Sequence, residues 1–201
     1  MEKGKFITVE GVDGAGKSTQ MAVIDQALRE RGIDLVRTRE PGGPETAEKI
    51  RELLLNEPMS PKCELMLMFA AREENLDKII RPALAKGRWV LCDRFTDASY
   101  AYQGYGRGRS IEEIRALENF VHPDLKPDLT VLFDVPTEVA AARLSRKLDR
   151  FEKESQDFHR HVREGYLRMA KAEPERFYVV DGTQTPEQIS AQLREVFAQW
   201  K

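Results

Sequence analysis

The sequence predicts a three-layer α/β fold in which a five-stranded parallel sheet lies between two layers of helices. Two observations lead to this prediction. Short apolar segments that are typical of buried strands alternate with longer amphipathic segments that are typical of helices, and a glycine-rich phosphate-binding motif lies between the first strand and the first helix. Because strands separated by helices cannot form hairpins, we expect parallel strands joined by right-handed crossovers.

Five segments qualify as buried strands because they are short and rich in valine, leucine, isoleucine or phenylalanine. They are Lys5–Glu10, Asp34–Thr38, Trp89–Cys92, Leu129–Asp134 and Phe177–Asp181. Apolar helix faces follow the first two strands, formed by Met21, Ile24 and Leu28 and by Ile50, Leu53 and Leu54. In sheets of this kind ligands bind beyond the carboxyl ends of the strands, so the residues directly after each strand are the candidates for chemistry.

The composition is that of an ordinary globular chain. With 201 residues, of which 41% are hydrophobic and 33% charged, we expect one domain over residues 1–201 with a substantial core. The 32 basic and 34 acidic residues give a net charge of −2 without any block of like charge, so we expect no nucleic acid and no membrane surface as a partner. The longest apolar run, Leu65 to Ala71, is too short to span a bilayer.

The N-terminus and the cysteines favour a cytoplasmic protein. Met1 to Lys5 leads directly into the first strand without the apolar stretch of a signal peptide. Cys63 and Cys92 have no zinc-binding or CxxC spacing, so we expect two thiols. The three histidines show no metal-binding spacing either, and we expect no zinc site.

The segment after the first strand matches the phosphate-loop pattern G-x-x-x-x-G-K-[ST] at every specified position. It consists of Gly11, Val12, Asp13, Gly14, Ala15, Gly16, Lys17, Ser18 and Thr19. The glycines allow backbone N–H groups to turn toward phosphate oxygens at a helix N-terminus. We expect Lys17 to contact the β- and γ-phosphates of a nucleoside triphosphate and the hydroxyl of Ser18 to bind Mg²⁺.

A phosphate loop by itself is compatible with switch GTPases, motor ATPases and small-molecule kinases. No guanine-reading motif follows a later strand, which counts against a GTPase. Asp13 is unusual inside such a loop because an anion there faces the incoming phosphates. It either caps the following helix or accepts a hydrogen bond from a substrate hydroxyl.

Charged residues also follow the second and third strands. Arg39, Glu40 and Pro41 follow the second strand and form either a turn with solvated charges or part of a site at the sheet edge. Asp93 and Arg94 follow the third strand. We expect the carboxylate of Asp93 to bind Mg²⁺ and the guanidinium of Arg94 to bind phosphate.

Asp134, at the end of the fourth strand, is the alternative residue for Mg²⁺. The residues after it indicate the start of a helix, so Asp93 is the preferred ligand.

Three further segments have the residues of a binding site. Arg72 follows Met68 and Phe69 by one helical turn, and the group either sandwiches a base or combines core packing with a surface charge. The stretch Thr96–Arg109 has the polar, aromatic and glycine-rich composition of a binding surface. The basic run from Arg143 to Arg150 is either a solvated helix face or a lid that closes over phosphates.

Together these motifs resemble those of thymidylate kinases, in the same order and over nearly the whole chain. The matching segments are Gly11–Thr19, Thr38–Gly43, Asp93–Phe95, Ala101–Gly104 and Asp149–Glu152. The resemblance implies the P-loop kinase fold, transfer of the γ-phosphoryl group of ATP to dTMP with Mg²⁺, and a homodimer. A kinase for another nucleoside monophosphate and a P-loop nucleotide switch are the alternatives.

The resemblance also implies roles for single residues at the nucleoside. Asp13 would bind the 3′-hydroxyl of the deoxyribose, Arg94 would bind the phosphate of dTMP and Arg51 would line the same pocket. Phe69, or its neighbour Met68, would stack on thymine. The other members of the expected substrate-binding set are Glu40, Pro41, Arg72, Ser99, Tyr102 and Gln103. Of these, Arg72, Ser99 and Gln103 would read the base, and Tyr102 would lie against the 2′ position of the sugar.

The chain departs from the family pattern at three positions. Pro44 and Tyr105 stand where bacterial members often carry threonine and glycine. Gly14 stands where some members carry an arginine inside the phosphate loop.

Without that arginine, another cation must stabilise the transferred phosphoryl group. We expect Arg146 to do so from a lid at residues 143–153, with Arg143 near the adenine and Arg150 anchoring the lid. The predicted catalytic residues are therefore Lys17, Asp93, Arg94 and Arg146.

Overall fold

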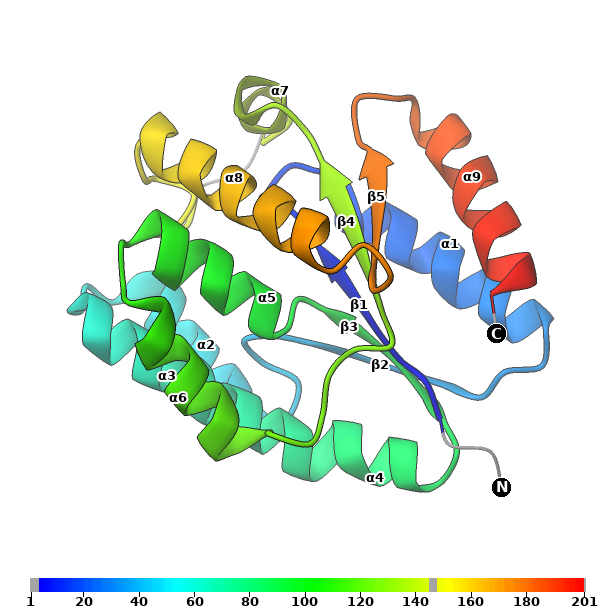
Figure 1. Cartoon of the computed structure of the whole chain (residues 1–201), viewed down its shortest axis with the longest axis horizontal. Helices are drawn as coiled ribbons and strands as arrows, with labels where there is room; N and C mark the ends of the chain where they lie inside the picture. Colours follow the sequence, from blue (N-terminus) through cyan, green and yellow to red (C-terminus); the bar gives the residue numbers. More distant parts are fainter. Residues whose placement is uncertain (1–3, 145–147, 201) are drawn as a thin grey trace.

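The structure, a computed structural model, describes residues 4–144 and 148–200 and is built on one five-stranded sheet (Figure 1). The strands are β1 (Phe6–Glu10), β2 (Leu35–Arg39), β3 (Trp89–Asp93), β4 (Leu129–Asp134) and β5 (Phe177–Asp181). All four pairings are parallel, in the order β2-β3-β1-β4-β5. The predicted parallel α/β sheet is confirmed, and its strand boundaries differ from the predicted ones by one residue at most.

Helices cover both faces of the sheet. The longer ones are α1 (Lys17–Glu30), α2 (Glu45–Asn56), α3 (Pro61–Asn75), α6 (Ile111–Val121), α8 (Gln156–Ala172) and α9 (Pro186–Gln199). The shorter ones are η1 (Leu76–Ile80), α4 (Arg81–Ala85), α5 (Thr96–Ser99), η2 (Tyr100–Gly106) and α7 (Thr137–Ala142), where η denotes a wider π-type turn. Figure 1 shows α1 and α9 side by side on one face, while α8 crosses the other.

Side chains of β1 alternate between these two faces, as the pleat of a strand requires. Ile7 and Val9 pack in the same core as the apolar face of α1. Phe6 lies in a second core with Leu76 and Ile80 of η1. Glu10 has the same parity as Phe6 and therefore faces α8, where it meets Tyr166.

The stretch Thr96–Arg109, predicted only as a binding surface, folds into α5 and η2 and packs against α8. Two glycines permit the close approach: a Cβ at Gly106 would lie 2.6 Å from the ring of Phe158, and one at Gly165 would lie 2.4 Å from the ring of Tyr105. Tyr105, one of the departures from the family pattern, is thus packed on α8. Pro44, another departure, is the N-cap residue of α2.

The carboxyl ends of β1, β3 and the edge strand β2 are joined by backbone hydrogen bonds. The N–H of Arg94 donates to the carbonyl of Val9 at 3.0 Å, and the N–H of Glu40 donates to the carbonyl of Asp93 at 2.8 Å. The residues after β1, β2 and β3 are therefore held at one edge of the sheet. Across residues 4–144 and 148–200, the helices lack the length and apolar character that crossing a bilayer would need.

Candidate active site

The phosphate loop occupies the turn between β1 and α1. Gly11, Gly14 and Gly16 all have positive φ, at 134°, 82° and 91°. A Cβ at Gly11 would lie 2.5 Å from the carbonyl oxygen of Phe133, and one at Gly14 would lie 2.2 Å from that of Ala140. Helix α1 begins without a side-chain cap, so its first N–H groups are available to an anion.

Lys17 is buried at the start of α1 with its ammonium group inside the loop. The Nζ atom donates to the carbonyl oxygens of Gly11 at 2.9 Å and Val12 at 3.0 Å. Burial and the nearby Arg94 cation lower the pKa of Lys17 below its usual value. A phosphate bound in the loop would oppose both effects, because an opposite charge favours the charged form.

Asp13 does not cap the helix, so that alternative from the sequence is wrong. The N-cap residue of α1 is Gly16, and the Asp13 carboxylate accepts hydrogen bonds from Arg94 at 2.9 Å and from the hydroxyl of Tyr102 at 3.1 Å. Burial raises the pKa of Asp13, but the Arg94 and Lys17 cations outweigh burial and lower the pKa below its usual range. The carboxylate is therefore charged and sits at the mouth of the loop.

Arg94 crosses from β3 to the phosphate loop. It has φ of 69°, and it alone among the non-glycine residues that the structure describes has a positive φ. Its guanidinium donates to Asp13, to the carbonyl of Gly11 at 2.8 Å and to the hydroxyl of Tyr166 at 3.2 Å, and it lies 4.9 Å from the ring centre of Tyr102. A left-handed arginine costs on the order of 1 kcal/mol, which these contacts must offset.

Glu10 supports the backbone after β3 and was not among the residues predicted for the site. One carboxylate oxygen accepts the N–H of Phe95, and the other accepts the hydroxyl of Tyr166, both at 2.7 Å. Complete burial, with a further contribution from Asp97, raises the pKa of Glu10 to about 8. An acidic residue at the end of an otherwise apolar strand is the signal that would have identified it.

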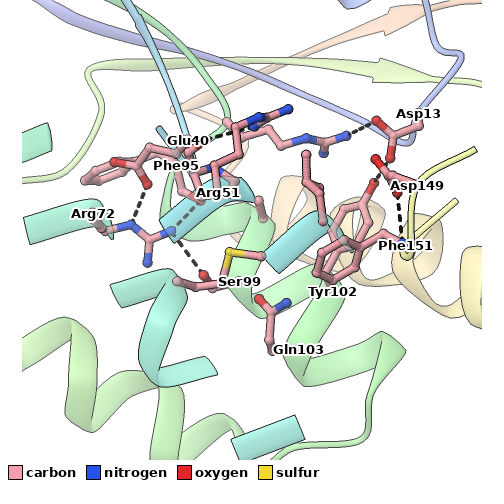
Figure 2. Close-up of a pocket in the computed structure, with 15 residues that line it drawn as sticks. Asp13, Glu40, Arg51, Arg72, Phe95, Ser99, Tyr102, Gln103, Asp149 and Phe151 are labelled. Atoms are coloured by element: carbon pink, nitrogen blue, oxygen red, sulfur yellow. Dashed lines mark hydrogen bonds and ion pairs between the residues drawn. The ribbon is translucent and has the colours of Figure 1, made fainter. Parts of the chain in front are cut away.

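A cavity of about 580 Å³ opens beside the loop, between α2, α3 and η2 (Figure 2). The lining includes nine of the ten residues predicted to bind the substrate: Asp13, Glu40, Pro41, Arg51, Arg72, Arg94, Ser99, Tyr102 and Gln103. Met68, the predicted alternative to Phe69, also lines it, and residues without a predicted role complete the wall: Leu55, Phe95, Ala98, Asp149 and Phe151. The sequence-distant segments of the predicted site thus meet around one hollow.

Arg72 is the most deeply buried cation of this cavity, with 2% of its surface exposed. Its Nε donates to Glu40 at 2.7 Å, and its Nη2 donates to the hydroxyl of Ser99 at 3.1 Å and to the carbonyl of Phe95 at 3.2 Å. The remaining nitrogen, Nη1, is buried and has no partner among the described residues. Arg72 is therefore not a surface charge, and it keeps one free donor.

Glu40 is buried as the partner of Arg72, with 4% of its surface exposed. Burial raises the pKa of Glu40, and the adjacent Arg72 opposes that shift. The prediction of a turn with solvated charges is thus wrong for Glu40. Arg39, by contrast, is half-exposed and pairs with Glu48 at 2.7 Å.

The expectation that Phe69 stacks on the base is wrong. Phe69 is 2% exposed, packs with Leu65 and Ile114, and lies 4.5 Å behind the guanidinium of Arg72. Met68 lines the cavity instead, because consecutive residues of a helix point about 100° apart. Phe95, after β3, also lines the cavity, as do Tyr102 and Phe151.

A second cleft holds the phosphate loop and adjoins the first cavity. Besides the loop residues from Asp13 to Thr19, its lining includes Arg39, Asp93, Arg143 and Leu144. Asp13, Glu40, Arg51 and Arg94 line both hollows. Burial, the Arg39 cation and the Arg94 cation lower the pKa of Arg51, so an anion at this junction would be favourable.

Asp93 fits the expected metal ligand better than Asp134. Asp134 is held by both guanidinium nitrogens of Arg163, at 2.6 Å and 2.9 Å. Asp93 shares the cleft with Ser18, and its Oδ1 is buried without a partner in the described part of the chain. The described residues contain no cluster of three or more acidic, histidine or cysteine side chains that could hold a metal ion.

The arginines of the predicted lid have different surroundings. Arg143 lines the phosphate cleft and donates to the carbonyl of Gly182 at 2.9 Å. Arg150 is directed away from that cleft and donates to the carbonyl of Leu54 at 3.0 Å and to Glu64 at 2.7 Å. Arg146, the predicted catalytic arginine, lies outside the described residues.

Known proteins match this chain over nearly its whole length. The family model for thymidylate kinase matches residues 9–193. The thymidylate kinase of Methylobacillus flagellatus is 51% identical, with 99% of each chain covered, and that of Bordetella pertussis is 54% identical, with 98% of each covered. A crystal structure of thymidylate kinase from Ehrlichia chaffeensis superposes with a TM-score of 0.78 at 33% identity, over 97% of this chain and 99% of that one. With this sequence similarity and a two-part site on a P-loop sheet, the chain belongs to the thymidylate kinase family.

Proposed function

We propose that the chain transfers the γ-phosphoryl group of ATP to dTMP and releases dTDP and ADP. One observation carries the proposal: the cavity and the phosphate-loop cleft share a wall of Asp13, Glu40, Arg51 and Arg94. An acceptor phosphate at that wall would face the γ-phosphate of a donor in the loop. Holding two reactants in line in this way supplies a large part of the catalysis of phosphoryl transfer.

The donor side follows from the loop. Lys17 would turn from its two carbonyl partners to the β- and γ-phosphates of ATP. Ser18 and Asp93 would hold Mg²⁺ between them and the phosphates, and the free Oδ1 of Asp93 supports this role. When bound, the ion neutralises charge on the phosphate oxygens.

The acceptor side follows from the cavity. The charged Asp13 would accept a hydrogen bond from the sugar 3′-hydroxyl, and Arg94 and Arg51 would bind the phosphate of dTMP. The free Nη1 of Arg72 supports a hydrogen bond to a carbonyl oxygen of thymine. Met68 and Phe95 would contact the faces of the base, with Tyr102 beside C2′.

Residues 143–153 would form a lid over the phosphates of ATP. Arg143, at the rim of the phosphate cleft, is placed to contact ATP, and Arg150 would anchor the segment to α2 and α3. We assign to Arg146 the contact with the transferred phosphoryl group.

We also propose a cytoplasmic homodimer. Exposed apolar side chains support the dimer: Leu53 on α2, Met66 on α3 and Phe120 on α6 are 49%, 51% and 86% exposed on neighbouring helices. Cys63 and Cys92 are both free thiols, as a reducing compartment would require.

Assays with a panel of nucleoside monophosphates test the function. The purified chain is incubated with ATP, Mg²⁺ and each of dTMP, dUMP, dCMP, dGMP and AMP, and ADP formation is followed. We expect dTMP to give the highest kcat/KM. A higher value for another monophosphate would identify a different acceptor, and ADP formation that no acceptor increases would indicate a nucleotide switch.

A further inference from the structure

Glu64 on α3 is a buried carboxylate that takes no direct part in the site described above. Only 1% of its surface is exposed, and it lies among the nitrogen donors of three side chains. The amide Nε2 of Gln103 donates to Oε1 at 2.9 Å, Arg150 donates to Oε2 at 2.7 Å, and Arg107 lies 3.3 Å from Oε2. These three residues come from η2, from the position that follows it, and from the predicted lid segment.

This contact determines which end of the Gln103 amide faces the cavity. A carboxylate can only accept hydrogen bonds, so the NH₂ end of the amide must turn toward Glu64. The carbonyl end of the amide then faces away from Glu64. No residue that the structure describes donates a hydrogen bond to Oε1 of Gln103. Gln103 lines the cavity, and Figure 2 shows its amide group directed into it from below.

The amide orientation matters because pyrimidine bases differ at the edge that such a group can read. Thymine and uracil present an N3–H donor beside the O4 acceptor. Cytosine presents the opposite pattern, an N3 acceptor beside the N4 amino donor. A cavity that offers the Arg72 Nη1 donor and the Gln103 Oε1 acceptor matches the first pattern and leaves buried groups unpaired against the second.

We propose that Glu64 is a positioning residue that sets base specificity by fixing the amide of Gln103 with its oxygen toward the base. This inference rests on the proposed function. Two guanidinium groups hold the carboxylate in place, so the orientation does not depend on the substrate. Among the hydrogen bonds and ion pairs of the described residues, Gln103 is the cavity-lining partner of Glu64.

The variant Glu64→Gln tests this role directly. A glutamine at position 64 can donate as well as accept, so the amide of Gln103 is free to turn its NH₂ end toward the base. We expect the ratio of kcat/KM for dTMP to kcat/KM for dCMP to fall at least about tenfold, with the remaining discrimination supplied by Arg72. The ratio of dTMP to dUMP should stay unchanged, because these two bases have the same edge and differ only in a methyl group.

The matched control is Glu154→Gln. Glu154 pairs with the same Arg107 at 2.5 Å but does not touch Gln103, so the variant removes a carboxylate from this charge network without freeing the amide. Both ratios should equal those of the wild type. A fall of both ratios by the same factor in Glu64→Gln, or an unchanged dTMP to dCMP ratio, overturns the proposal.

A double-mutant cycle with Gln103→Ala checks the route of the effect. If Glu64 acts through Gln103, the change Glu64→Gln adds nothing to the loss of dTMP to dCMP selectivity once the amide is gone. An equal further loss in the Gln103→Ala background contradicts the mechanism.

If Glu64→Gln does not fold, Glu64→Asp provides the second variant. It keeps the negative charge for the two arginines but withdraws the oxygens from Gln103, and the same selective fall is expected. Wild-type chain that fails to phosphorylate dTMP would refute the proposed function itself. Wild-type activity on dTMP together with unchanged selectivity in these variants would refute only the role of Glu64.

Discussion

Asp13 and Arg94 lie where the cavity meets the phosphate cleft, and they line both. Asp13 is held by Arg94 and Tyr102, and Arg94 is in turn held by the loop carbonyl of Gly11 and by Tyr166. Asp13 and Arg94, which we expect to touch the nucleotide, are therefore already oriented by other protein groups. Such preorganisation lowers the cost of ordering the site when the substrates bind.

Replacing Asp13 with asparagine should separate substrate recognition from stability. Loss of a charge-assisted hydrogen bond to the 3′-hydroxyl should lower kcat/KM for dTMP by about ten- to a hundredfold. The loss should be much smaller for the 3′-deoxy analogue, which lacks that hydroxyl. Steady-state kinetics with both substrates measure the difference, and equal losses would show that Asp13 acts only on the protein.

Replacing Lys17 with methionine should affect rate and stability in opposite directions. The ammonium neutralises charge on the transferring phosphoryl group, so kcat should fall by about a thousandfold or more. Stability should be kept or raised, because burial of the ammonium is unfavourable and lowers the pKa of Lys17. The two readouts are kcat and Tm, and a near-wild-type kcat would remove Lys17 from the mechanism.

At the scale of elements, the C-terminal end of α6 is tied to the turn after β3. His122 is 1% exposed; its Nδ1 lies 3.1 Å from the carbonyl of Leu125, and its Nε2 lies 2.8 Å from the hydroxyl of Thr96. Since a carbonyl only accepts, Nδ1 carries the proton and Nε2 accepts from Thr96. The neutral ring thus connects α6 to the start of α5, next to the cavity.

This tie predicts a pH dependence of stability. Burial, with a contribution from Arg72, lowers the pKa of His122 from 6.5 to about 4. His122 is therefore protonated at a lower pH in the folded state than in the unfolded chain. The stabilisation is fully present above pH 6.5 and is lost as the pH falls toward 4.

Between pH 7 and pH 5 the loss should amount to about 2 kcal/mol. The variant His122→Asn keeps a donor for the carbonyl of Leu125 but cannot titrate. From pH 7 to pH 5, the free energy of unfolding of the variant should therefore fall by about 2 kcal/mol less than that of the wild type. Urea denaturation at the two pH values measures both proteins. Parallel pH dependences would contradict the assignment.

At the scale of the whole molecule, the apolar side chains of Leu53, Met66 and Phe120 are exposed on the adjacent helices α2, α3 and α6. In Figure 1 these helices lie together, on the opposite side of the fold from α9. Phe120 is the most exposed of the three, and burying such a side chain in an interface contributes about 2 kcal/mol per copy.

Replacing Phe120 with glutamate should therefore convert the proposed dimer into a monomer. An acidic residue in an apolar interface is desolvated without a partner. Sedimentation velocity at micromolar concentration measures the change. The matched control is Val179→Glu, because Val179 is 44% exposed on the edge strand β5 and should leave the oligomeric state unchanged. A wild-type chain that sediments as a monomer would contradict the proposed dimer.

The sequence by itself determined the features that depend on local patterns. Five short apolar segments between amphipathic ones predict a parallel sheet, because a strand must be apolar on both sides when helices cover both faces. The phosphate loop is recognisable because its function needs glycines and a lysine at fixed spacing along one turn. The joining of strand ends at one edge of the sheet then follows from their shared direction.

Only the tertiary structure decided which way particular side chains face. Met68 and Phe69 are adjacent in an apolar helix, and only the packing of α3 against α6 shows that Phe69 is in the core and Met68 in the cavity. Glu10 and Glu64 lie in apolar surroundings in the sequence, and their partners are 156 and 86 residues away. Such roles cannot be predicted from local periodicity, because a buried charge is stabilised by groups that only the folded chain brings to it.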